Sequence, residues 1–234
     1  MVFSMLAPSR CMRCARPPDR LCSRCASELF APTLVARADF VGVRLAQVNR
    51  STLRVVRAMK DGGETALLRV VLGAAGLDGL RVGLSNTRPG SILFVPVPSS
   101  HSSWRKRGFN LAREMAHWLA SHCIEPALVS KSLEFVYEPR DQRGLGVRAR
   151  ARNVAGAMSV DATALESETA RLQAVGQPVA VVICDDVVTT GSTLFEARRA
   201  LLAAFTRAEA QPSISFFALA ETLSKNDTQT AGRV

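Results

Sequence analysis

The chain has 234 residues, of which 47% are hydrophobic and 21% charged, so it can fold around a core and is not a disordered chain. Its formal net charge of +10 suits an anionic partner, either phosphorylated small molecules or nucleic acid, although an arginine-rich genome composition produces the same balance. No apolar run approaches the roughly 20 residues of a membrane helix, and residues 1–10 lack the features of a secretory signal, so we expect no membrane insertion and a cytoplasmic location.

Four of the six cysteines lie near the start of the chain: Cys11, Cys14, Cys22 and Cys25. They form two C-x-x-C pairs separated by seven residues, and four thiolates at this spacing complete a tetrahedral zinc site. Because no fifth ligand is required, we predict a closed, structural site. We expect residues 1–32 to be a zinc knuckle ordered by its metal, with an iron–sulfur cluster or a redox pair as alternatives.

Helical periodicity dominates the next segment. We predict helix over most of residues 33–82, with apolar side chains at helical spacing on either side of Gly62 and Gly63, which separate two helices. An apolar run at 92–97 predicts a buried strand, and the polar residues 99–103 predict a loop.

The segment from 110 to 153 combines a helix, a short strand and a loop. Asn110 is a plausible N-cap for a helix, and residues 127–129 predict a strand. The segment 137–153 is rich in Arg and Gly and has little apolar periodicity, so we predict a long mobile loop that acts as a lid.

Residues 178–184 (PVAVVIC) carry the strongest strand signal in the chain, because the run is continuous and mostly β-branched. We predict a loop at 185–192, a helix opened by Thr193 with Glu196 completing a capping box, and a last strand at 213–220. Strands that alternate with helices predict an α/β fold with a mainly parallel sheet and helices on both faces. We therefore expect one domain over residues 33–222 and a flexible tail over 223–234.

The chemistry is concentrated where the 178–184 strand ends. Asp185 and Asp186 follow it directly, and in an open α/β sheet ligands bind beyond the carboxyl ends of the strands. Two adjacent carboxylates can accept hydrogen bonds from vicinal hydroxyls. The following loop is rich in hydroxyl side chains, contains Gly191 and enters a helix N-terminus, which is a ready phosphate site. Together they fit a ribose 5-phosphate; the alternative is a capped turn beside two solvated aspartates.

The segment VVICDDVVTTGST at 181–193 resembles the binding motif for 5-phosphoribosyl-1-pyrophosphate (PRPP) of type I phosphoribosyltransferases. The resemblance implies a type I phosphoribosyltransferase-like fold, ribose hydroxyls held by Asp185 and Asp186, and magnesium that arrives with PRPP. It also assigns the 5-phosphate to a group of loop residues: Val188, Thr189, Thr190, Gly191, Ser192 and Thr193.

Three further features resemble the ComF branch of competence-associated phosphoribosyltransferase-like proteins. The first is VPVP at residues 95–98, followed by RGFN at 107–110. The second is the Q-x-x-L…R-x-x-N pattern from Gln142 to Asn153, and the third is the set of four cysteines. The resemblance covers the chain from Cys11 to about Ala220. It makes pyrophosphate-binding candidates of Ser99, Ser100, Arg105 and Arg107. It places Gln142, Arg150 and Asn153 in a lid, and it leaves Arg140 as a catalytic candidate beside Asp185 and Asp186.

Two classes of function follow from these residues. The first is an enzyme that transfers ribose 5-phosphate from PRPP to an unidentified acceptor and releases pyrophosphate, linked to DNA uptake or competence. The second is a non-catalytic module that binds single-stranded DNA or a partner in the competence machinery, or that senses PRPP. Only 6% of residues are aromatic, which weakens a base-stacking platform. The sequence carries no signal for an oligomeric state.

Overall fold

The fold was analysed in a computed structural model, which describes residues 9–17, 19–37, 40–85, 87, 89–139, 147–173, 178–207 and 212–222. The predicted tail at 223–234, and Arg140 and Gln142 of the predicted lid, lie outside these residues. No helix in the described part of the chain has the length and apolarity that crossing a membrane requires.

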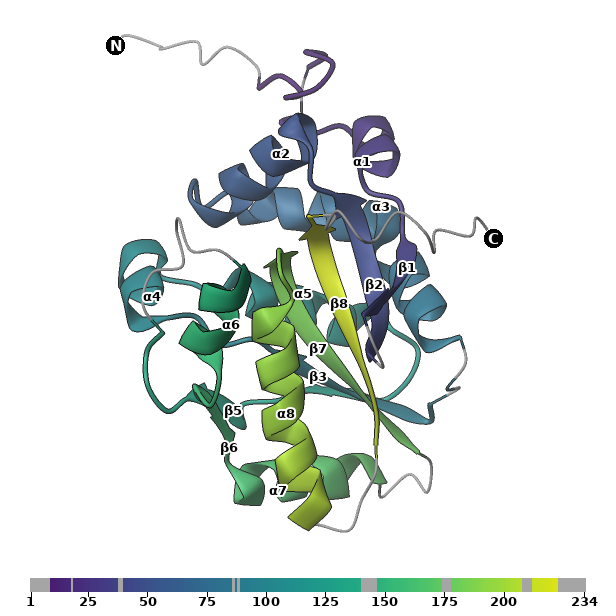
Figure 1. The fold of residues 1–234 in the computed structure, drawn as a ribbon. Helices are drawn as coiled ribbons and strands as arrows, with labels where there is room; N and C mark the ends of the chain where they lie inside the picture. Colours follow the sequence, from purple (N-terminus) through teal and green to yellow (C-terminus); the bar gives the residue numbers. More distant parts are fainter. Residues whose placement is uncertain are drawn as a thin grey trace, which may run out of the picture.

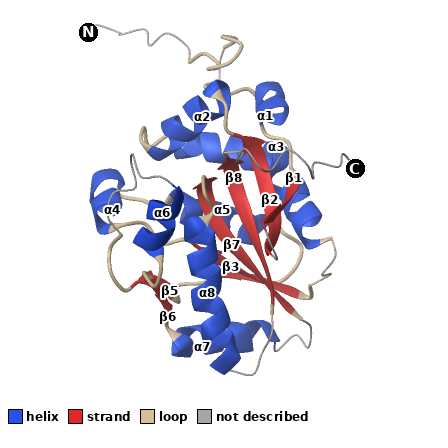
Figure 2. Ribbon diagram, viewed as in Figure 1, coloured by secondary structure: helices blue, strands red, loops and turns tan. Residues whose placement is uncertain are grey.

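A mainly parallel sheet forms the centre of the molecule, as predicted (Figure 2). Within the described residues its strand order is β1-β2-β8-β7-β3-β4. The strands are β1 (Thr33–Arg37), β2 (Phe40–Gln47), β3 (Ser91–Pro96), β4 (Ala127–Val129), β7 (Val179–Val188) and β8 (Ser213–Glu221). Every pairing is parallel except that of β1 with β2, and Ile183 of β7 lies between Val95 of β3 and Phe216 of β8. The predicted strands at 92–97, 127–129, 178–184 and 213–220 are therefore confirmed.

Helices cover both faces of this sheet (Figure 1). They are α1 (Ser23–Leu29), α2 (Arg50–Lys60), α3 (Thr65–Leu84), α4 (His101–Arg107), α5 (Leu111–His122), α6 (Val147–Val154), α7 (Ala162–Gln173) and α8 (Ser192–Arg207). Side chains of α2, α3 and α5 form one core with one face of the sheet, and side chains of α7 and α8 form a second core with the other. The α/β class with helices on both faces is confirmed.

The prediction of helix over residues 33–47 is wrong, because this segment is the antiparallel hairpin β1–β2. β2 extends the parallel sheet by pairing with β8, which buries Phe40, Val43 and Leu45. A Cβ on Gly42 would stand 2.3 Å from the ring of Phe216, so only glycine allows this approach of β2 to β8. The helices on either side of Gly62 and Gly63 are confirmed as α2 and α3.

Two predicted loops are partly helical. Residues 101–103 belong to α4, which the Ser100 hydroxyl caps by accepting the N–H of Ser103 at 3.2 Å. Residues 147–153 belong to α6, which packs beside α8, so the predicted mobile loop does not extend that far. A small second sheet of β5 (Leu133–Phe135) and β6 (Met158–Val160) flanks this region. The two strands were not predicted, because three-residue strands carry no periodicity, and α7 was not predicted either.

Candidate functional site: a cysteine cluster and a polar cavity at the carboxyl edge of the sheet

The four N-terminal cysteines converge on one point, although they belong to a turn and to the start of α1. Their Sγ atoms all lie within 4.8 Å of one another, and those of Cys14 and Cys22 are 3.9 Å apart. Thiolates around one zinc ion, each about 2.3 Å from the metal, stand at separations of this order. The donor set and its spacing fit a tetrahedral metal such as zinc. The prediction that these four residues come together in one cluster is confirmed, and the cluster could hold a metal such as zinc.

The thiols of the cluster differ in how readily they lose their protons. Burial raises the pKa of Cys11, but hydrogen bonds from the backbone N–H groups of Cys14, Cys22 and Arg13 outweigh it and bring this pKa down to about 6. Burial and the neighbouring thiols raise the pKa of Cys25 to about 12. Four thiolates held this close repel one another, so a bound cation is what allows all of them to be deprotonated together.

The cysteine cluster is anchored on the α2–α3 segment. Arg20 donates to both carboxylate oxygens of Glu64 just before α3, with Nε 2.9 Å from Oε2. Arg54 of α2 donates to the carbonyl oxygen of Met12 at 3.4 Å. Leu21 and Phe30 are 1% exposed and belong to the same core as α2 and α3. The segment that carries the cluster therefore packs against α2 and the start of α3 (Figure 1).

The acidic pair lies inside the end of β7 and not in a loop, which corrects the prediction of a loop at 185–192. β7 continues to Val188, and Asp185 lies opposite Ala218 of β8. The Oδ1 of Asp185 accepts the N–H of Asp186 at 2.8 Å, and the Oδ1 of Asp186 accepts the N–H of Val187 at 2.7 Å. Strand pairing and these bonds hold both carboxylates at the carboxyl edge of the sheet.

Lys60, the last residue of α2, reaches across to the acidic pair. Its Nζ lies 2.5 Å from Oδ2 of Asp186, and the two side chains are 32% and 16% exposed. Burial raises the pKa of Asp185 to about 7, with a further contribution from the charge of Asp186. The positive charge of Lys60 acts in the opposite direction. Lys60 thus compensates part of the negative charge at the end of β7.

The turn between β7 and α8 is short and rich in hydroxyl groups. Only residues 189–191 separate the two elements, and Gly191 is buried with φ of +77°, a conformation that other residues rarely adopt. The hydroxyls of Thr190 and Ser192 lie 2.8 Å apart. The helix begins at Ser192, and Glu196 does not complete a capping box. Its buried carboxylate instead accepts the N–H of Met158 and pairs with Arg199.

The segment after β3 lines the same space as the acidic pair and the turn before α8. Asn110 is confirmed as the N-cap of α5: its side-chain oxygen accepts the N–H of Arg113 at 3.2 Å. Its amide group also donates to the carbonyl oxygen of Val97 at 2.8 Å, which ties α5 to the end of β3. Residues 99 and 100 and the cationic end of α4 lie between these two fixed points.

These walls enclose a polar cavity of about 450 Å³. It is lined by Lys60, Asp61, Val97, Pro98, Ser99, Ser100, Ser102, Ser103, Lys106, Arg107, Asn110, Ala112, Phe135, Pro139, Asp185, Asp186, Val187, Thr189 and Thr193. The cavity brings the acidic pair together with predicted residues of both other groups, Ser99, Ser100 and Arg107 from one and Thr189 and Thr193 from the other. Arg105 is exposed on α4 and is not among the lining residues.

Predicted residues of the lid lie on α6 or outside the described part of the chain. Arg150 and Asn153 are partly buried on α6, and the Nε of Arg150 is buried without a hydrogen-bond partner among the described atoms. Three charged lining residues were not predicted as site residues: Lys60, Asp61 and Lys106. A basic residue followed by Asp-Gly-Gly at the end of an amphipathic helix marks the first two, but no sequence pattern indicates that α2 ends above β7.

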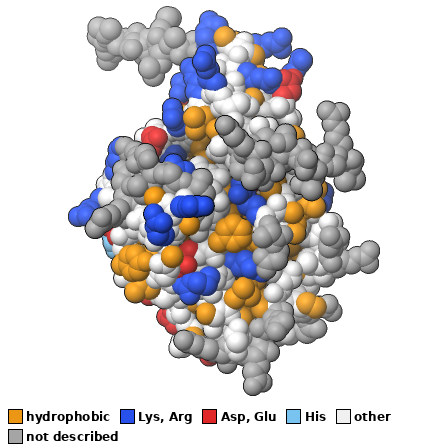
Figure 3. Space-filling model, viewed as in Figure 1, with side chains coloured by type: hydrophobic (Ala, Val, Ile, Leu, Met, Phe, Trp, Pro, Cys, Tyr) orange, Lys and Arg blue, Asp and Glu red, His pale blue; other side chains and the backbone are white. Residues whose placement is uncertain are grey.

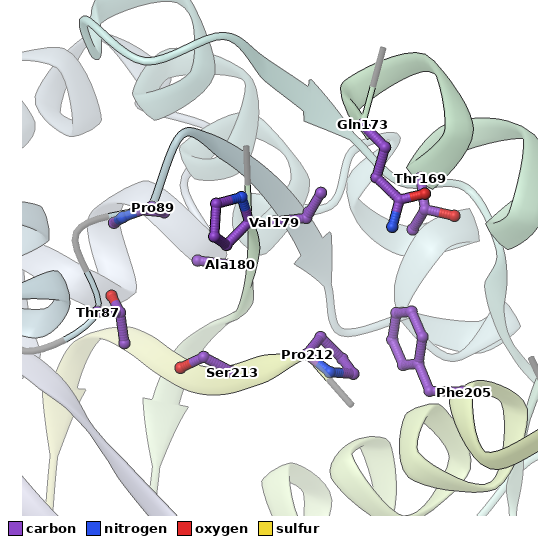
Figure 4. A pocket seen from close by; sticks show the side chains of 10 residues that line it. Thr87, Pro89, Thr169, Gln173, Val179, Ala180, Phe205, Pro212 and Ser213 are labelled. Atoms are coloured by element: carbon purple, nitrogen blue, oxygen red, sulfur yellow. The ribbon is translucent and has the colours of Figure 1, made fainter. Parts of the chain in front are cut away.

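A second cavity, of about 380 Å³, lies at the opposite edge of the sheet (Figure 4). Its lining includes Val179 and Ser213, the first residues of β7 and β8, together with Phe205, Pro178 and Pro212. The lining residues that the structure describes are mostly apolar, and none of them brings a titratable side chain into the cavity. The polar cavity at the carboxyl edge is therefore the candidate site.

The fold and the site define an α/β protein with a polar cavity at the carboxyl edge of a mainly parallel sheet and a metal-type cluster of four cysteines. The chain is 32% identical over 207 residues to the DNA utilization protein YhgH of Salmonella typhimurium, a match that covers 83% of this chain and 78% of that protein. The protein of the same name from Salmonella typhi matches with the same identity and coverage. No protein-family model matches the chain. The chain belongs to the family of these DNA utilization proteins.

Proposed function

We propose that the cavity at the carboxyl edge binds PRPP and that the chain transfers ribose 5-phosphate from it to a nucleophile. One observation carries this proposal: a single cavity of about 450 Å³ is lined by the acidic pair, the hydroxyl-rich turn and the serine-rich segment after β3. Its position beyond the carboxyl ends of parallel strands is the usual place for a nucleotide-like ligand. The type I phosphoribosyltransferase-like fold and the ComF branch are part of the same proposal.

Each wall of the cavity matches one part of PRPP. Asp185 and Asp186 accept hydrogen bonds from the ribose hydroxyls. The 5-phosphate is received, through N–H groups and hydroxyls, by the end of β7, the turn and the start of α8: Val188, Thr189, Thr190, Gly191, Ser192 and Thr193. Ser99, Ser100 and Arg107 face the pyrophosphate, for which the guanidinium fork of arginine is well suited. Arg105, Arg140, Gln142, Arg150 and Asn153 remain candidates for closing the site.

Magnesium fits the oxygen donors of this cavity, because carboxylates and hydroxyls are the hard ligands that it prefers. When bound, it would neutralise charge on the pyrophosphate. In the transfer the C1–oxygen bond to pyrophosphate breaks, its electron pair leaves with the pyrophosphate, and the acceptor's lone pair forms the new bond to C1. Lys106 and Arg107 stabilise the charge that develops on the leaving group.

Isothermal titration of PRPP with Mg²⁺ tests the binding step, with the Asp185→Asn, Asp186→Asn double variant as the comparison. We expect micromolar binding to the parent chain and a loss of at least tenfold in the variant, because hydrogen bonds to charged groups are worth about 1.5–3 kcal/mol each. A folded parent chain that does not bind PRPP contradicts the proposal. Binding without pyrophosphate release in the presence of any candidate acceptor favours a PRPP sensor.

A second candidate function is nucleic-acid binding, which would involve a basic surface on the cysteine cluster and α2. Lys and Arg side chains gather at this end of the molecule (Figure 3). The exposed arginines there are Arg10, Arg13, Arg16, Arg20, Arg24, Arg50, Arg54 and Arg57. The relatives' name, DNA utilization protein, is in keeping with a DNA ligand or a competence partner.

Fluorescence anisotropy with a single-stranded oligonucleotide at several salt concentrations tests this candidate. Replacing Arg16, Arg50 and Arg57 by Gln should weaken binding and flatten its salt dependence, because each lost phosphate contact reduces the slope by somewhat less than one. The same charge change at the exposed residues Arg69, Arg81 and Arg171 is the matched control. Equal losses in both triple variants would mean that only net charge matters.

A further inference from the structure

The Lys60–Asp186 pair places an ammonium group beside the carboxylate that the proposed function assigns to the ribose. The Nζ of Lys60 lies 2.5 Å from Oδ2 of Asp186, and both residues line the polar cavity. The other oxygen of this carboxylate, Oδ1, already accepts the N–H of Val187. A ligand hydroxyl that donates to Oδ2 of Asp186 would then share this oxygen with the Lys60 ammonium group.

The packing of α2 does not depend on this ion pair. Val55, Val56 and Met59 anchor the helix in the core with exposures of 2% or less, and Asn49 caps its first turn with hydrogen bonds of 2.9 and 3.0 Å. Lys60 is the last residue of the helix and is 32% exposed. A lysine ammonium on its four-carbon stem can move between nearby anions while the helix stays in place.

The same cavity also contains the wall that the proposed function assigns to the pyrophosphate. Lys60 shares the lining with Ser99, Ser100, Lys106 and Arg107, the wall assigned to the pyrophosphate. A ligand that has the vicinal diol but no pyrophosphate competes with Lys60 for Asp186. It offers the Lys60 ammonium group no anion at the wall assigned to the pyrophosphate. A ligand that also carries a pyrophosphate at C1 offers one, so the two ligands place opposite demands on Lys60.

We propose, on the basis of the proposed PRPP site, that Lys60 is a specificity-determining residue: it leaves Asp186 for the pyrophosphate and so favours PRPP over ribose 5-phosphate. The ion pair with Asp186 holds Lys60 beside the ribose subsite, and the ligand's own charge draws it away. Discrimination then depends on the difference between two partners of the same lysine, one in the protein and one in the ligand.

The test compares the affinities of PRPP and ribose 5-phosphate, both with Mg²⁺, for the parent chain, Lys60→Met, Lys60→Arg and Lys131→Met. Lys131 is exposed and does not line this cavity, so its replacement is the matched control. We expect Lys60→Met to weaken PRPP by about tenfold or more, while ribose 5-phosphate binds as well as before or better. Lys60→Arg should restore most of the preference, and Lys131→Met should change neither affinity.

The outcomes separate this inference from the proposal on which it rests. If the parent chain binds neither ligand, the proposed function fails and the inference fails with it. If the parent chain binds both ligands and Lys60→Met weakens them equally, the PRPP site stands and the specificity role of Lys60 is overturned. Thermal unfolding of each variant, expected to match that of Lys131→Met, shows that a lost preference does not come from misfolding.

Discussion

The Nε of Arg37 in β1 lies 2.6 Å from Oε1 of Glu221 at the end of β8; the Glu221 side chain is buried and that of Arg37 largely so, with exposures of 1% and 10%. Arg44 of β2 approaches the other oxygen of the same carboxylate at 3.3 Å. Arg37 also reaches the carbonyl oxygen of Thr190, at 3.5 Å, in the turn before α8. One carboxylate thus links the β1–β2 hairpin to the parallel sheet directly behind the candidate phosphate turn.

Replacing Glu221 by Gln should lower the free energy of unfolding by about 3 kcal/mol or more. The change leaves two buried guanidinium groups without their counter-charge, and breaking a buried pair in this way typically costs 3–5 kcal/mol. Urea denaturation measures the loss. Asp78→Asn is the control, because it breaks the exposed Arg81–Asp78 pair and should cost less than about 1 kcal/mol. Similar losses in both variants would show that the network contributes no more than a surface pair.

Gly191→Ala should destabilise the chain by about 1–2 kcal/mol, because Gly191 has φ of +77° and left-handed backbone is costly for any residue with a Cβ. The added methyl group would also stand 3.3 Å from Nη1 of Arg37. The control is Gly73→Ala on the exposed side of α3, where a Cβ meets nothing within 4 Å. That change should stabilise the helix by up to about 1 kcal/mol, so chemical denaturation should give shifts of opposite sign.

The raised pKa of Asp185 makes stability depend on pH. The folded chain keeps a proton on this carboxyl up to about pH 7, whereas the unfolded chain loses it near pH 4. In this window the folded state binds more protons, so the free energy of unfolding falls as pH rises, by at most about 1.4 kcal/mol per pH unit. Asp185→Asn removes this loss and keeps the oxygen that accepts the Asp186 N–H.

Urea denaturation of the parent chain and of Asp185→Asn at pH 5, 6, 7 and 8 measures this effect. The advantage of the variant should grow up to about pH 7 and then level off. Parallel curves at all four pH values would mean that Asp185 titrates at an ordinary carboxyl pKa in the folded chain.

The cysteine cluster should bind one zinc ion per chain. Cys25→Ser should lose the metal and lower the unfolding temperature by about 5 °C or more, because metal binding contributes directly to folding. Cys123→Ser is the control, since Cys123 lies at the end of α5 and outside the cluster. Elemental analysis and thermal unfolding, with and without a chelator, measure both effects. Full zinc content in Cys25→Ser would contradict the four-ligand site.

The parts of the fold that were predicted correctly are those in which local pattern and final environment agree. The run at 178–184 is apolar on both faces because β7 is covered by helices on both sides, and Asn110 caps α5 through its own side chain. The β1–β2 hairpin was missed although β2 carries a strand pattern, in which Val41, Val43 and Leu45 alternate with Gly42 and Arg44. Both residues are explained by contacts with a segment far away in the chain. Gly42 lets β2 approach Phe216, and Arg44 pairs with Glu221.

The residues of the candidate site also differ in how well the sequence predicts them. The acidic pair and the hydroxyl-rich turn are contiguous in sequence, so their chemistry could be predicted from the residues alone. Lys60 is more than 120 residues from Asp186 in the chain, and only the packing of α2 against the end of the sheet brings them to 2.5 Å. Sequence periodicity predicted that helix, but it contains no information about the strand on which the helix ends.

Leu21, Ala26 and Phe30 are almost fully buried in the core that they share with α2 and α3. Residues 21–30 therefore cover the apolar side of α3 and are an integral part of this core. A chain shortened to begin at residue 33 would expose apolar side chains of this core to water, which promotes self-association. Exchanging this segment between relatives would likewise require the facing side chains of α3 to be exchanged with it, so the two should vary together in evolution.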